Sequence, residues 1–434
     1  MHFRLISLLI IISSLIIMSC EKLATDPGGD DMTVQTENGV NYWGGAYNDY
    51  GYGVVQTADG GYAVAGSQYT STTSQEDLIM AKFNSQLVFE DTTILGTSGA
   101  KNVANDIQQT NDGGYILVGN TFNGTDDDVW IVKLGPTLEK AWEDTIKGKD
   151  ATFGDDWGNS IQQINSGNYV ICGTRFDTDN GEYDIMLWTY SHDGTDGTPK
   201  LIFADTDASG TTNTTNDYGS HAQQTSDGGF VIVGTQGNDI AVIKLVPAAA
   251  GAYNDDTNFG DDGAGGDGHL AIDVGTNSID EGIFIQQTAD GQYIVVGNTE
   301  NGTGQLSDVY VNTISNAGIA GNSPITLGGA YDDKASCVRQ TTDGGFVLAG
   351  EKYRGLDADS EYDVWVVKLT DALTVHWNYT FGGDMNDYAS SISQTDDGGY
   401  IITGHTMSYG DQSEIILLKL DHDGKIDENI GDLD

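Results

Sequence analysis

The sequence predicts an all-β fold: a seven-bladed β-propeller of four-stranded antiparallel blades, closed by an N-terminal strand. Three observations predict it. One motif occurs seven times, each copy is followed by apolar runs of strand length, and no segment combines helical periodicity with helix caps. The structural alternatives are a β-solenoid, whose repeats are usually shorter, and a row of small sandwiches, for which no linkers are found.

The repeated motif, Gln-Thr-x-Asp-Gly-Gly-Tyr, predicts the first two strands of each blade. Its copies start at Gln56, Gln109, Gln163, Gln224, Gln287, Gln340 and Gln394. Asp-Gly favours tight turns because both residues tolerate positive φ, so each copy indicates a β-hairpin, although the third copy is degenerate. The run that follows, such as residues 115–119, is apolar at successive positions, which predicts a strand buried on both faces.

Two more strands complete each unit. Residues 128–134 are typical of the third strand and residues 375–381 of the weaker fourth strand. Residues 40–45 match the end of a fourth strand, whereas the last third strand, 415–420, is followed only by a short polar tail. We therefore expect the N-terminal segment to complete the last blade, which would remove two free sheet edges.

The first twenty residues predict export. A basic start is followed by an apolar run at 5–17, which has the length of a signal peptide and is short for a membrane span. Ile17-Met18-Ser19-Cys20 resembles the lipobox of bacterial lipoproteins, which implies cleavage before Cys20 and lipid on its thiol. An ordinary secretory signal is the alternative.

The chain thus divides into a signal peptide (1–19), an acidic flexible tether (20–39) and the propeller (40–434). No later stretch is apolar enough to cross a membrane, so the lipid would be its only membrane attachment. Acidic residues after Cys20 resemble the surface-export signal of Bacteroidetes lipoproteins. This resemblance implies the outer membrane of a Gram-negative bacterium, with the propeller at the cell surface.

The repeats resemble those of exported bacterial propeller proteins that are common in Bacteroidetes. The segments 258–263 and 273–275 also resemble the delta-sixty repeat. The resemblance covers residues 40–425 and implies a fold, but no activity, because propellers host many functions.

Charge and cysteine content exclude several classes of partner. The chain has 65 Asp and Glu against 18 Lys and Arg, a formal net charge of −47. A nucleic acid needs a basic face, and an anionic lipid surface would be repelled, so we expect neither as a partner. Cys172 and Cys337 lie three repeats apart, so we expect two free thiols in the core.

Residues that recur in every blade are expected to serve blade geometry, because one active site does not need seven copies. Three sets of residues recur in this way. Two sets, one acidic and one small, lie in the first strands, and the third consists of the acids that open the third strands. Seven residues before each Gln lies Asp49, Asn102, Asp156, Asp217, Asp280, Asp333 or Asp387. Five before it lies Gly51, Ala104, Gly158, Gly219, Gly282, Ala335 or Ala389. Each third strand opens with Asp77, Asp128, Asp184, Asp239, Asp308, Asp363 or Glu414. We expect the acids to accept backbone N–H bonds, and the small residues to lie in crowded strands near the axis.

Alternation of strand direction assigns two faces. The Asp-Gly-Gly hairpins form a uniform lower face, and the longer, variable connections form an upper face, which is the natural binding surface. Four aromatic residues follow the upper acids of their blades: Tyr50, Trp157, Tyr218 and Tyr388. Pointing outward they would form platforms for sugar rings or apolar groups of a partner; pointing inward they would fill space between blades.

Three upper loops, residues 123–128, 177–184 and 357–363, are candidate Ca²⁺ sites, because alternate carboxylates suit a hard cation. The proposed ligands are Asp177, Asp179 and Asp184 in the second loop and Asp357, Asp359 and Asp363 in the third. None of the loops matches the full EF-hand pattern, and plain solvated loops are the alternative.

Other catalytic and cofactor motifs are absent from the sequence. There is no P-loop, nucleophile elbow or zinc-binding helix motif, and the glycine-rich run 263–268 has no helix after it. We therefore expect no nucleotide, haem or quinone. His221 is expected to be a packed core residue, and the arginines, Arg175, Arg339 and Arg354 among them, are too dispersed for a sialidase cluster.

The favoured hypothesis is a monomeric, non-catalytic module that binds glycan or protein at the cell surface, with Ca²⁺ assisting. One alternative is a glycoside hydrolase or lyase with a carboxylate pair on the upper face. Another is a structural scaffold of a surface complex. The sequence does not decide whether the protein is an enzyme.

Overall fold

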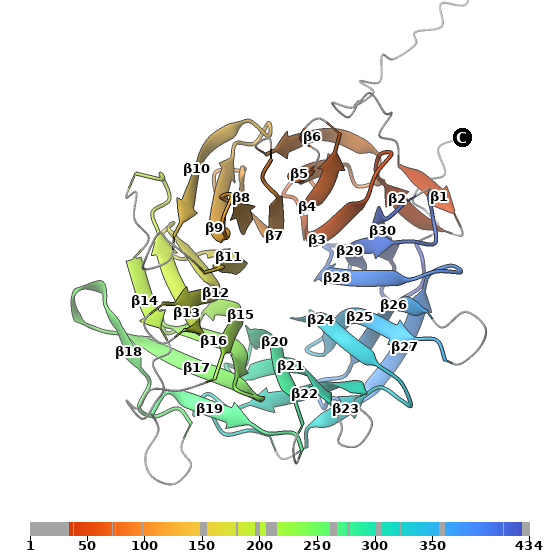
Figure 1. Cartoon of the computed structure of the whole chain (residues 1–434). Coiled ribbons are helices and arrows are strands. Elements are labelled where there is room, and N and C mark those ends of the chain that lie inside the picture. Colours follow the sequence, from red (N-terminus) through yellow and green to blue (C-terminus); the bar gives the residue numbers. More distant parts are fainter. Residues whose placement is uncertain are drawn as a thin grey trace, which may run out of the picture.

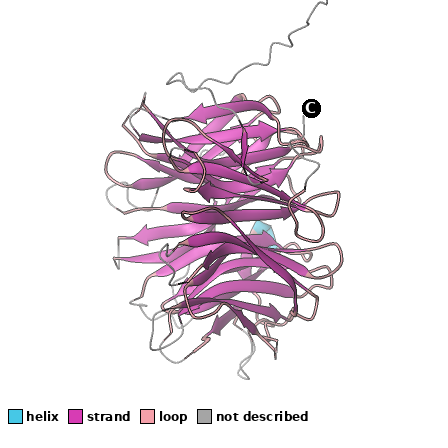
Figure 2. Cartoon of the chain, turned by 90° about the vertical axis from the view of Figure 1, so that its right-hand side faces the viewer, coloured by secondary structure: helices cyan, strands magenta, loops and turns pink. Residues whose placement is uncertain are grey.

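Seven antiparallel sheets are arranged in a ring (Figure 1), which confirms the predicted seven-bladed propeller. The computed structural model describes residues 34–427 except 38, 72, 74, 97–98, 148–153, 179–180, 196–199, 205–214, 261–266, 276–277, 301–305, 322, 356–360 and 411. Seen from the side, the strands cross the middle of the molecule and the loops lie at its two faces (Figure 2). The described residues contain one helical turn, η1 (Ala249–Gly251). None of the described helices is long and apolar enough to cross a membrane.

Each blade begins with an inner strand that faces the axis of the ring. Blade 1 contains β3 (Asp49–Gln56), β4 (Tyr62–Thr70), β5 (Gln75–Phe83) and β6 (Phe89–Leu95). Blade 2 contains β7 (Asn102–Gln109), β8 (Tyr115–Phe122), β9 (Asp127–Leu134) and β10 (Lys140–Ile146). Blade 3 contains β11 (Trp157–Gln163), β12 (Tyr169–Asp177), β13 (Glu182–Tyr190) and β14 (Lys200–Ala204). Blade 4 contains β15 (Asp217–Gln224), β16 (Phe230–Gln236), β17 (Asp239–Pro247), β18 (Tyr253–Asp255) and β19 (His269–Ile272).

The remaining blades follow the same order. Blade 5 contains β20 (Asp280–Gln287), β21 (Tyr293–Glu300), β22 (Ser307–Ile314) and β23 (Ile325–Leu327). Blade 6 contains β24 (Asp333–Gln340), β25 (Phe346–Tyr353), β26 (Tyr362–Leu369) and β27 (Val375–Phe381). Blade 7 contains β28 (Asp387–Gln394), β29 (Tyr400–Thr406) and β30 (Glu414–Leu420), together with β2 (Val40–Trp43) and β1 (Gln35–Glu37).

The N-terminal strand closes the ring as predicted. In β2, Tyr42 is paired with Ile416 of β30, so β2 takes the place of the fourth strand of blade 7. An additional exposed strand, β1, pairs with β2 and lies within the segment predicted to be a flexible tether. Pairing with β2 orders the end of that segment. The signal peptide, and Cys20 with it, lies outside the described residues.

The glutamine of the repeated motif joins neighbouring blades. Its side-chain oxygen accepts a hydrogen bond from the backbone of the preceding blade's hairpin; Gln109 bonds the N–H of Ala58 at 2.8 Å, for example. All seven motif glutamines make this bond. The seventh bond runs from Asp396 N–H of blade 7 to Gln56 of blade 1, at 2.8 Å, and so crosses the closure.

The motif aspartate acts through its side chain and not through a positive φ. In the first hairpin, Gly60 has φ +85°, whereas Asp59 is not among the residues with positive φ. Asp59 instead accepts hydrogen bonds from Thr57 and from Gly61 N–H, and it pairs with Lys82 of the third strand at 2.6 Å. The predicted hairpin is confirmed: glycine supplies the positive φ and aspartate caps the turn.

The core lies between the blades. One cluster of buried residues joins Val64 and Phe83 of blade 1 to Leu417 of blade 7, and the next joins Met80 of blade 1 to Leu117 of blade 2. Each sheet is therefore buried on both faces, as the continuous apolar runs predicted. Cys172 and Cys337 are free and buried, which confirms that expectation.

The small residues near the axis also act between blades. A β-carbon added at Gly282 of β20 would collide with the carbonyl oxygen of Gly234 in the neighbouring blade. At the equivalent position of other blades, Ala104, Ala335 and Ala389 are almost fully buried. The predicted crowding of the inner strands is therefore confirmed.

Candidate functional site

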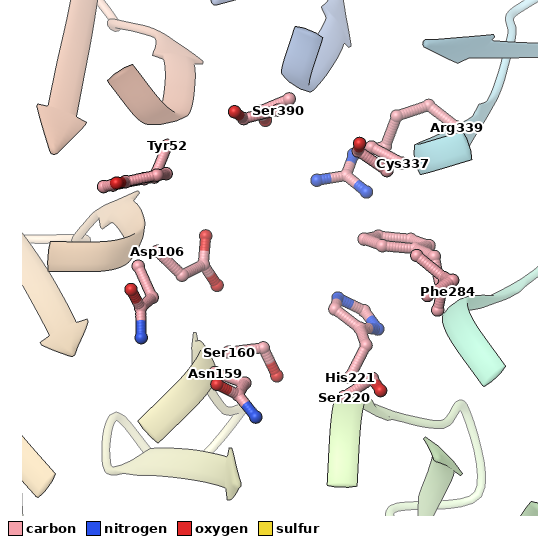
Figure 3. Close-up of a pocket in the computed structure, with 14 residues that line it drawn as sticks. Tyr52, Asp106, Asn159, Ser160, Ser220, His221, Phe284, Cys337, Arg339 and Ser390 are labelled. Atoms are coloured by element: carbon pink, nitrogen blue, oxygen red, sulfur yellow. The ribbon is translucent and has the colours of Figure 1, made fainter. Parts of the chain in front are cut away.

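A central channel is lined by rings of side chains, one from each blade. Two adjoining cavities inside it have volumes of about 110 and 220 Å³. The upper ring consists of the residues four positions before each motif glutamine: Tyr52, Asn105, Asn159, Ser220, Ile283, Ser336 and Ser390. Below it, Asp106, His221 and Arg339 point into the channel from three different blades (Figure 3).

Asp106 holds two blades together. One carboxylate oxygen accepts a hydrogen bond from Ile107 N–H at 2.8 Å, and the other accepts one from Ile161 N–H of blade 3 at 2.9 Å. Burial raises the pKa of Asp106 to about 6, although Arg339 and these N–H groups oppose the shift. Because both oxygens already serve the scaffold, the carboxylate has little capacity left for a ligand.

His221 and Arg339 both lie against Phe284. The imidazole stacks on the ring with a centroid distance of 3.7 Å, and the guanidinium carbon lies 4.2 Å from the ring centroid. Burial, with Arg339 nearby, lowers the pKa of His221 to about 3, so the imidazole is neutral near pH 7. His221 is thus packed, as predicted, but it also lines the channel.

Each of the two adjoining cavities is by itself smaller than the roughly 300–1,000 Å³ of typical ligand pockets. The faces of the ring offer more room for a large ligand than either cavity.

The upper face carries a continuous arc of aromatic rings. We define the aromatic arc as Tyr331, Tyr353, Tyr362, Tyr388, His405 and Tyr50, which lie on or next to blades 6, 7 and 1. Successive ring centroids are separated by 5.1, 5.2, 5.8, 4.7 and 5.0 Å in that order. All six side chains are partly exposed. Tyr50 also stacks on Tyr52 at 6.3 Å, which extends the arc toward the channel.

A second, smaller aromatic group lies on blades 3 and 4. Tyr183 stacks on Trp157 at 5.0 Å and on Tyr218 at 5.6 Å, and it meets Phe176 edge-on at 5.1 Å. The four predicted aromatics therefore fall into two separate groups: Tyr50 and Tyr388 in the arc, and Trp157 and Tyr218 here. None is fully buried, and Tyr218 is 37% exposed.

Large apolar side chains are also exposed on the upper connections. They are Tyr47, Tyr218, Ile279, Leu306, Met385 and Met407. The other exposed large hydrophobics, Ile319, Val375 and Tyr379, lie on or near outer strands. Exposed apolar area is thus concentrated on the face that carries the variable loops.

The recurrent acids serve the upper connections, as predicted. Asp49 accepts from Gly45 N–H at 2.6 Å, Asp333 from Tyr353 N–H at 3.1 Å and Asp387 from Gly383 N–H at 2.8 Å. Asp156, Asp217 and Asp280 make equivalent bonds to backbone N–H groups.

Described members of two of the candidate Ca²⁺ loops are close to arginines. Asp177 and Asp184 lie 3.5 and 3.7 Å from the guanidinium of Arg175, and Asp363 lies 3.1 Å from Nε of Arg354. Asp179, Asp357 and Asp359 lie outside the described residues. Calcium binding by these loops stays a prediction.

Sequence reasoning missed Asp106 and most of the arc. Asp106 could have been found by aligning the inner strands, since it is the one acidic residue three positions before a motif glutamine. Tyr353, Tyr362 and His405 belong to second and third strands, whose register across blades is not apparent from the repeat alone.

Comparison with known proteins yields likenesses of fold. No family model matches the chain, and no curated protein matches it. Sqt1 from Chaetomium thermophilum has a TM-score of 0.49 at 8% identity, over 87% of this chain and 97% of that one. YCF48 from Cyanidioschyzon merolae has a TM-score of 0.48 at 8% identity, with the same coverage of 87% and 97%. Penicillium chrysogenum alpha-L-arabinanase, complexed with arabinobiose, has a TM-score of 0.46 at 11% identity, over 72% and 92%. Likenesses this distant assign no function.

The pKa shifts of buried acids and of buried histidines have opposite effects on stability in mildly acidic solution. Burial raises the pKa of Asp106 and of Asp363 to about 6, so the folded state gains protons, and stability, as the pH falls from 7 through 6. Burial lowers the pKa of His221 to about 3 and of His405 to about 4, so the unfolded state alone gains these protons below about pH 6.5, and stability is lost. Hydrogen bonds from Lys82 and Thr57 lower the pKa of Asp59 to about 2, so its contribution is lost between about pH 4 and 2. Because the acids and histidines roughly offset each other, we expect the thermal midpoint to change little from pH 7 to 5 and to fall below pH 4.

A pH series at constant ionic strength measures this dependence. Asp363→Asn removes one of the two raised acids and should make the midpoint fall between pH 7 and 5, because the buried histidines then dominate. A wild-type midpoint that rises by several degrees from pH 7 to 5 would contradict the prediction.

Proposed function

We propose that this propeller is a non-catalytic module that binds glycan on its upper face. The observation that supports the proposal is the aromatic arc, which offers partly exposed rings over three consecutive blades. Sugar rings pack their C–H faces on aromatic rings, and a row of rings suits an extended chain of sugars.

Carboxylates lie among these rings and could accept hydrogen bonds from sugar hydroxyls. Burial raises the pKa of Tyr362, and the negative charges of Asp332 and Glu351 raise it further. Burial and the negative charge of Glu76 raise the pKa of Tyr50 in the same way. The net charge of −47 would repel polyanions, so a neutral glycan is the expected class.

A glycan array followed by titration calorimetry with the best neutral ligand tests the proposal. Tyr388→Ala removes a ring from the middle of the arc and should weaken binding about tenfold, since one aromatic contact contributes roughly 1.5 kcal/mol. The matched control is Tyr379→Ala, because Tyr379 is 40% exposed on the outer strand β27, away from the arc.

The outcome for the two variants separates the possibilities. Equal affinity of the Tyr388 variant and the wild type would exclude the arc as the binding surface. If Trp157→Ala weakens binding and Tyr388→Ala does not, the smaller aromatic group of blades 3 and 4 is the site. Failure to bind any glycan, with capture of a protein partner through the upper face, would favour the scaffold alternative.

A second candidate function is glycoside hydrolysis, and one observation favours it. Burial raises the pKa of Glu351, which lies in β25 beside the arc; Lys334 opposes this shift and Asp332 adds to it. A carboxyl with a raised pKa near a second carboxylate is the kind of pair that glycosidases use. Glu351→Gln should then abolish release of reducing ends while binding is retained. Absence of release by the wild-type protein on bound glycan would reject hydrolysis.

The place of action follows from the sequence. We propose that the propeller is held at the outer surface of a Gram-negative cell by lipid on Cys20. Cys20→Ala should move the protein from the membrane fraction to the soluble fraction. Surface protease treatment of intact cells then distinguishes the outer leaflet from the periplasmic side.

A further inference from the structure

Three carboxylates meet where blade 4 adjoins blade 5 on the upper face. Asp239 opens β17, Asp273 follows β19, and Asp280 opens β20. One oxygen from each of these side chains lies within 4.8 Å of the other two. We call this group the 4–5 carboxylate cluster; it is distinct from all three loops for which the sequence predicted Ca²⁺.

Asp280 supplies an independent indication of a ligand. Its side chain is fully buried, with 0% exposed. Oδ2 accepts hydrogen bonds from Val274 N–H at 2.8 Å and from Ser278 Oγ at 3.1 Å, whereas Oδ1 has no hydrogen-bond partner among the described residues. A buried carboxylate oxygen without a partner is costly, so Oδ1 is the atom left to bind something.

At some other blade junctions a cation lies beside such acids, although Asp49 Oδ1 and Asp363 Oδ1 also lack a hydrogen-bond partner among the described residues. The third-strand acid of one blade meets the first-strand acid of the next, as Asp363 meets Asp387 on either side of Gly382. At that junction Arg354 Nε lies 3.1 Å from Asp363. At the junction of blades 5 and 6, Lys352 Nζ lies 3.7 Å from Asp333.

At the junction of blades 1 and 2 the negative charge is smaller, because an asparagine replaces one of the two acids. There the first-strand position holds Asn102, whose amide donates to Asp77 at 3.5 Å, and Thr70 and Thr73 also donate to Asp77. Between blades 4 and 5, by contrast, a third carboxylate, Asp273, is added. Across the part of the chain described, no lysine or arginine lies within ion-pair distance of the three cluster residues.

We propose that the 4–5 carboxylate cluster binds a hard divalent cation, Ca²⁺ in the first place. The available donors are all oxygens, from three carboxylates and the neighbouring Ser278 hydroxyl, with no histidine or cysteine among them. Oxygen donors in an irregular loop suit Ca²⁺, which accepts six to eight ligands, better than Zn²⁺ or a transition metal. Burial and repulsion from Asp273 and Asp280 raise the pKa of Asp239, and a bound cation would relieve that repulsion.

The position of the cluster indicates what the ion would do. In blade 4 the third strand β17 pairs with both β18 and β19, an arrangement that the described residues show in no other blade; we call residues 253–273 the blade 4 insertion. Asp273 lies where this insertion returns to the inner strand β20. A cation held by Asp239, Asp273 and Asp280 would fasten the insertion to both blades and stabilise their junction.

Calcium titration of the full chain, after dialysis against EDTA, tests the proposal. We expect calorimetry to detect binding, and the thermal midpoint to rise with CaCl₂ and less with MgCl₂. Asp273→Asn should weaken binding at least tenfold and remove the shift; because Asp273 is exposed, this variant should fold. Asp255→Asn is the matched control, since Asp255 is an exposed acid of the same insertion outside the cluster.

Two results would overturn the proposal. One is the absence of Ca²⁺ binding by the wild-type chain. The other is binding that persists in Asp273→Asn and Asp239→Asn but is lost in Asp179→Asn or Asp357→Asn, which would place the ion in the loops predicted from the sequence. If a proton and not a cation neutralises the cluster, Asp273→Asn should raise the thermal midpoint of the EDTA-treated protein. Addition of Ca²⁺ should then leave the thermal midpoint of the wild-type chain unchanged, and this result would also reject the site.

Discussion

Replacing Trp43 with alanine is expected to lower the free energy of unfolding by about 3–5 kcal/mol, the usual cost of truncating a fully buried tryptophan. Trp43 lies at the end of β2, the strand that completes blade 7, and its side chain is 0% exposed. Its ring stacks on Phe89 at 5.6 Å and meets Phe83 edge-on at 5.7 Å, both in blade 1. The variant therefore loosens the closure as well as the core.

Urea denaturation followed by circular dichroism measures this effect. The control is Tyr379→Ala, which truncates an aromatic side chain on the outer strand β27 that is 40% exposed, and should change stability by less than about 1 kcal/mol. If the two variants lose similar amounts, Trp43 does not anchor the closure. Increased proteolysis near the N-terminus of the Trp43 variant would show that the closure opens before the ring unfolds.

Gly119→Ala is expected to destabilise the protein by about 3 kcal/mol, at the upper end of the cost of overpacking. A β-carbon at Gly119 in β8 would overlap the carbonyl oxygen of Val103 in β7, and it would lie 2.9 Å from the Cα of Ala104. These are backbone atoms at the irregularity between Ala104 and Asp106, where the two strands shift register. Relief of the overlap would require separation of the strands.

Gly329→Ala provides the matched control. The nearest heavy atom to a β-carbon there is Asp333 Oδ2 at 3.8 Å, and the glycine does not need a positive φ. We expect a change below about 0.5 kcal/mol. A Gly119 variant as stable as the wild type would mean that the bulge can relax, and that the glycine is not required by the close approach of the strands.

The repeat was sufficient to predict the ring because its residues act locally. The hairpin from Thr57 to Gly61 is made by its own Thr, Asp and Gly, and the same bonds recur in the other complete copies. Two copies depart from this pattern: the degenerate third copy has Ser166 in place of the aspartate and Thr189 in place of the lysine, whereas blade 5 keeps Asp290 but has Thr313 at the lysine position. Turn chemistry of this kind depends on residues close together in the chain.

The aromatic surface shows where local reasoning stops. Four candidate rings were predicted from one position of the repeat, but the structure divides them between two groups. It also adds Tyr353, Tyr362 and His405 to the arc, from second and third strands. Whether such rings touch depends on how neighbouring blades are rotated and spaced, and this depends on packing throughout the ring.

The sequence by itself determined the seven blades, the N-terminal closure and the two faces, because these follow from hairpin turns, burial patterns and chain order. Only the tertiary structure decided which upper-face groups meet. Asp239 and Asp280 are 41 positions apart, as their numbers show, yet they share one cluster with Asp273. Long-range proximity of charges and rings arises when separate sheets pack against each other, and the energy of that packing is not encoded in any single repeat.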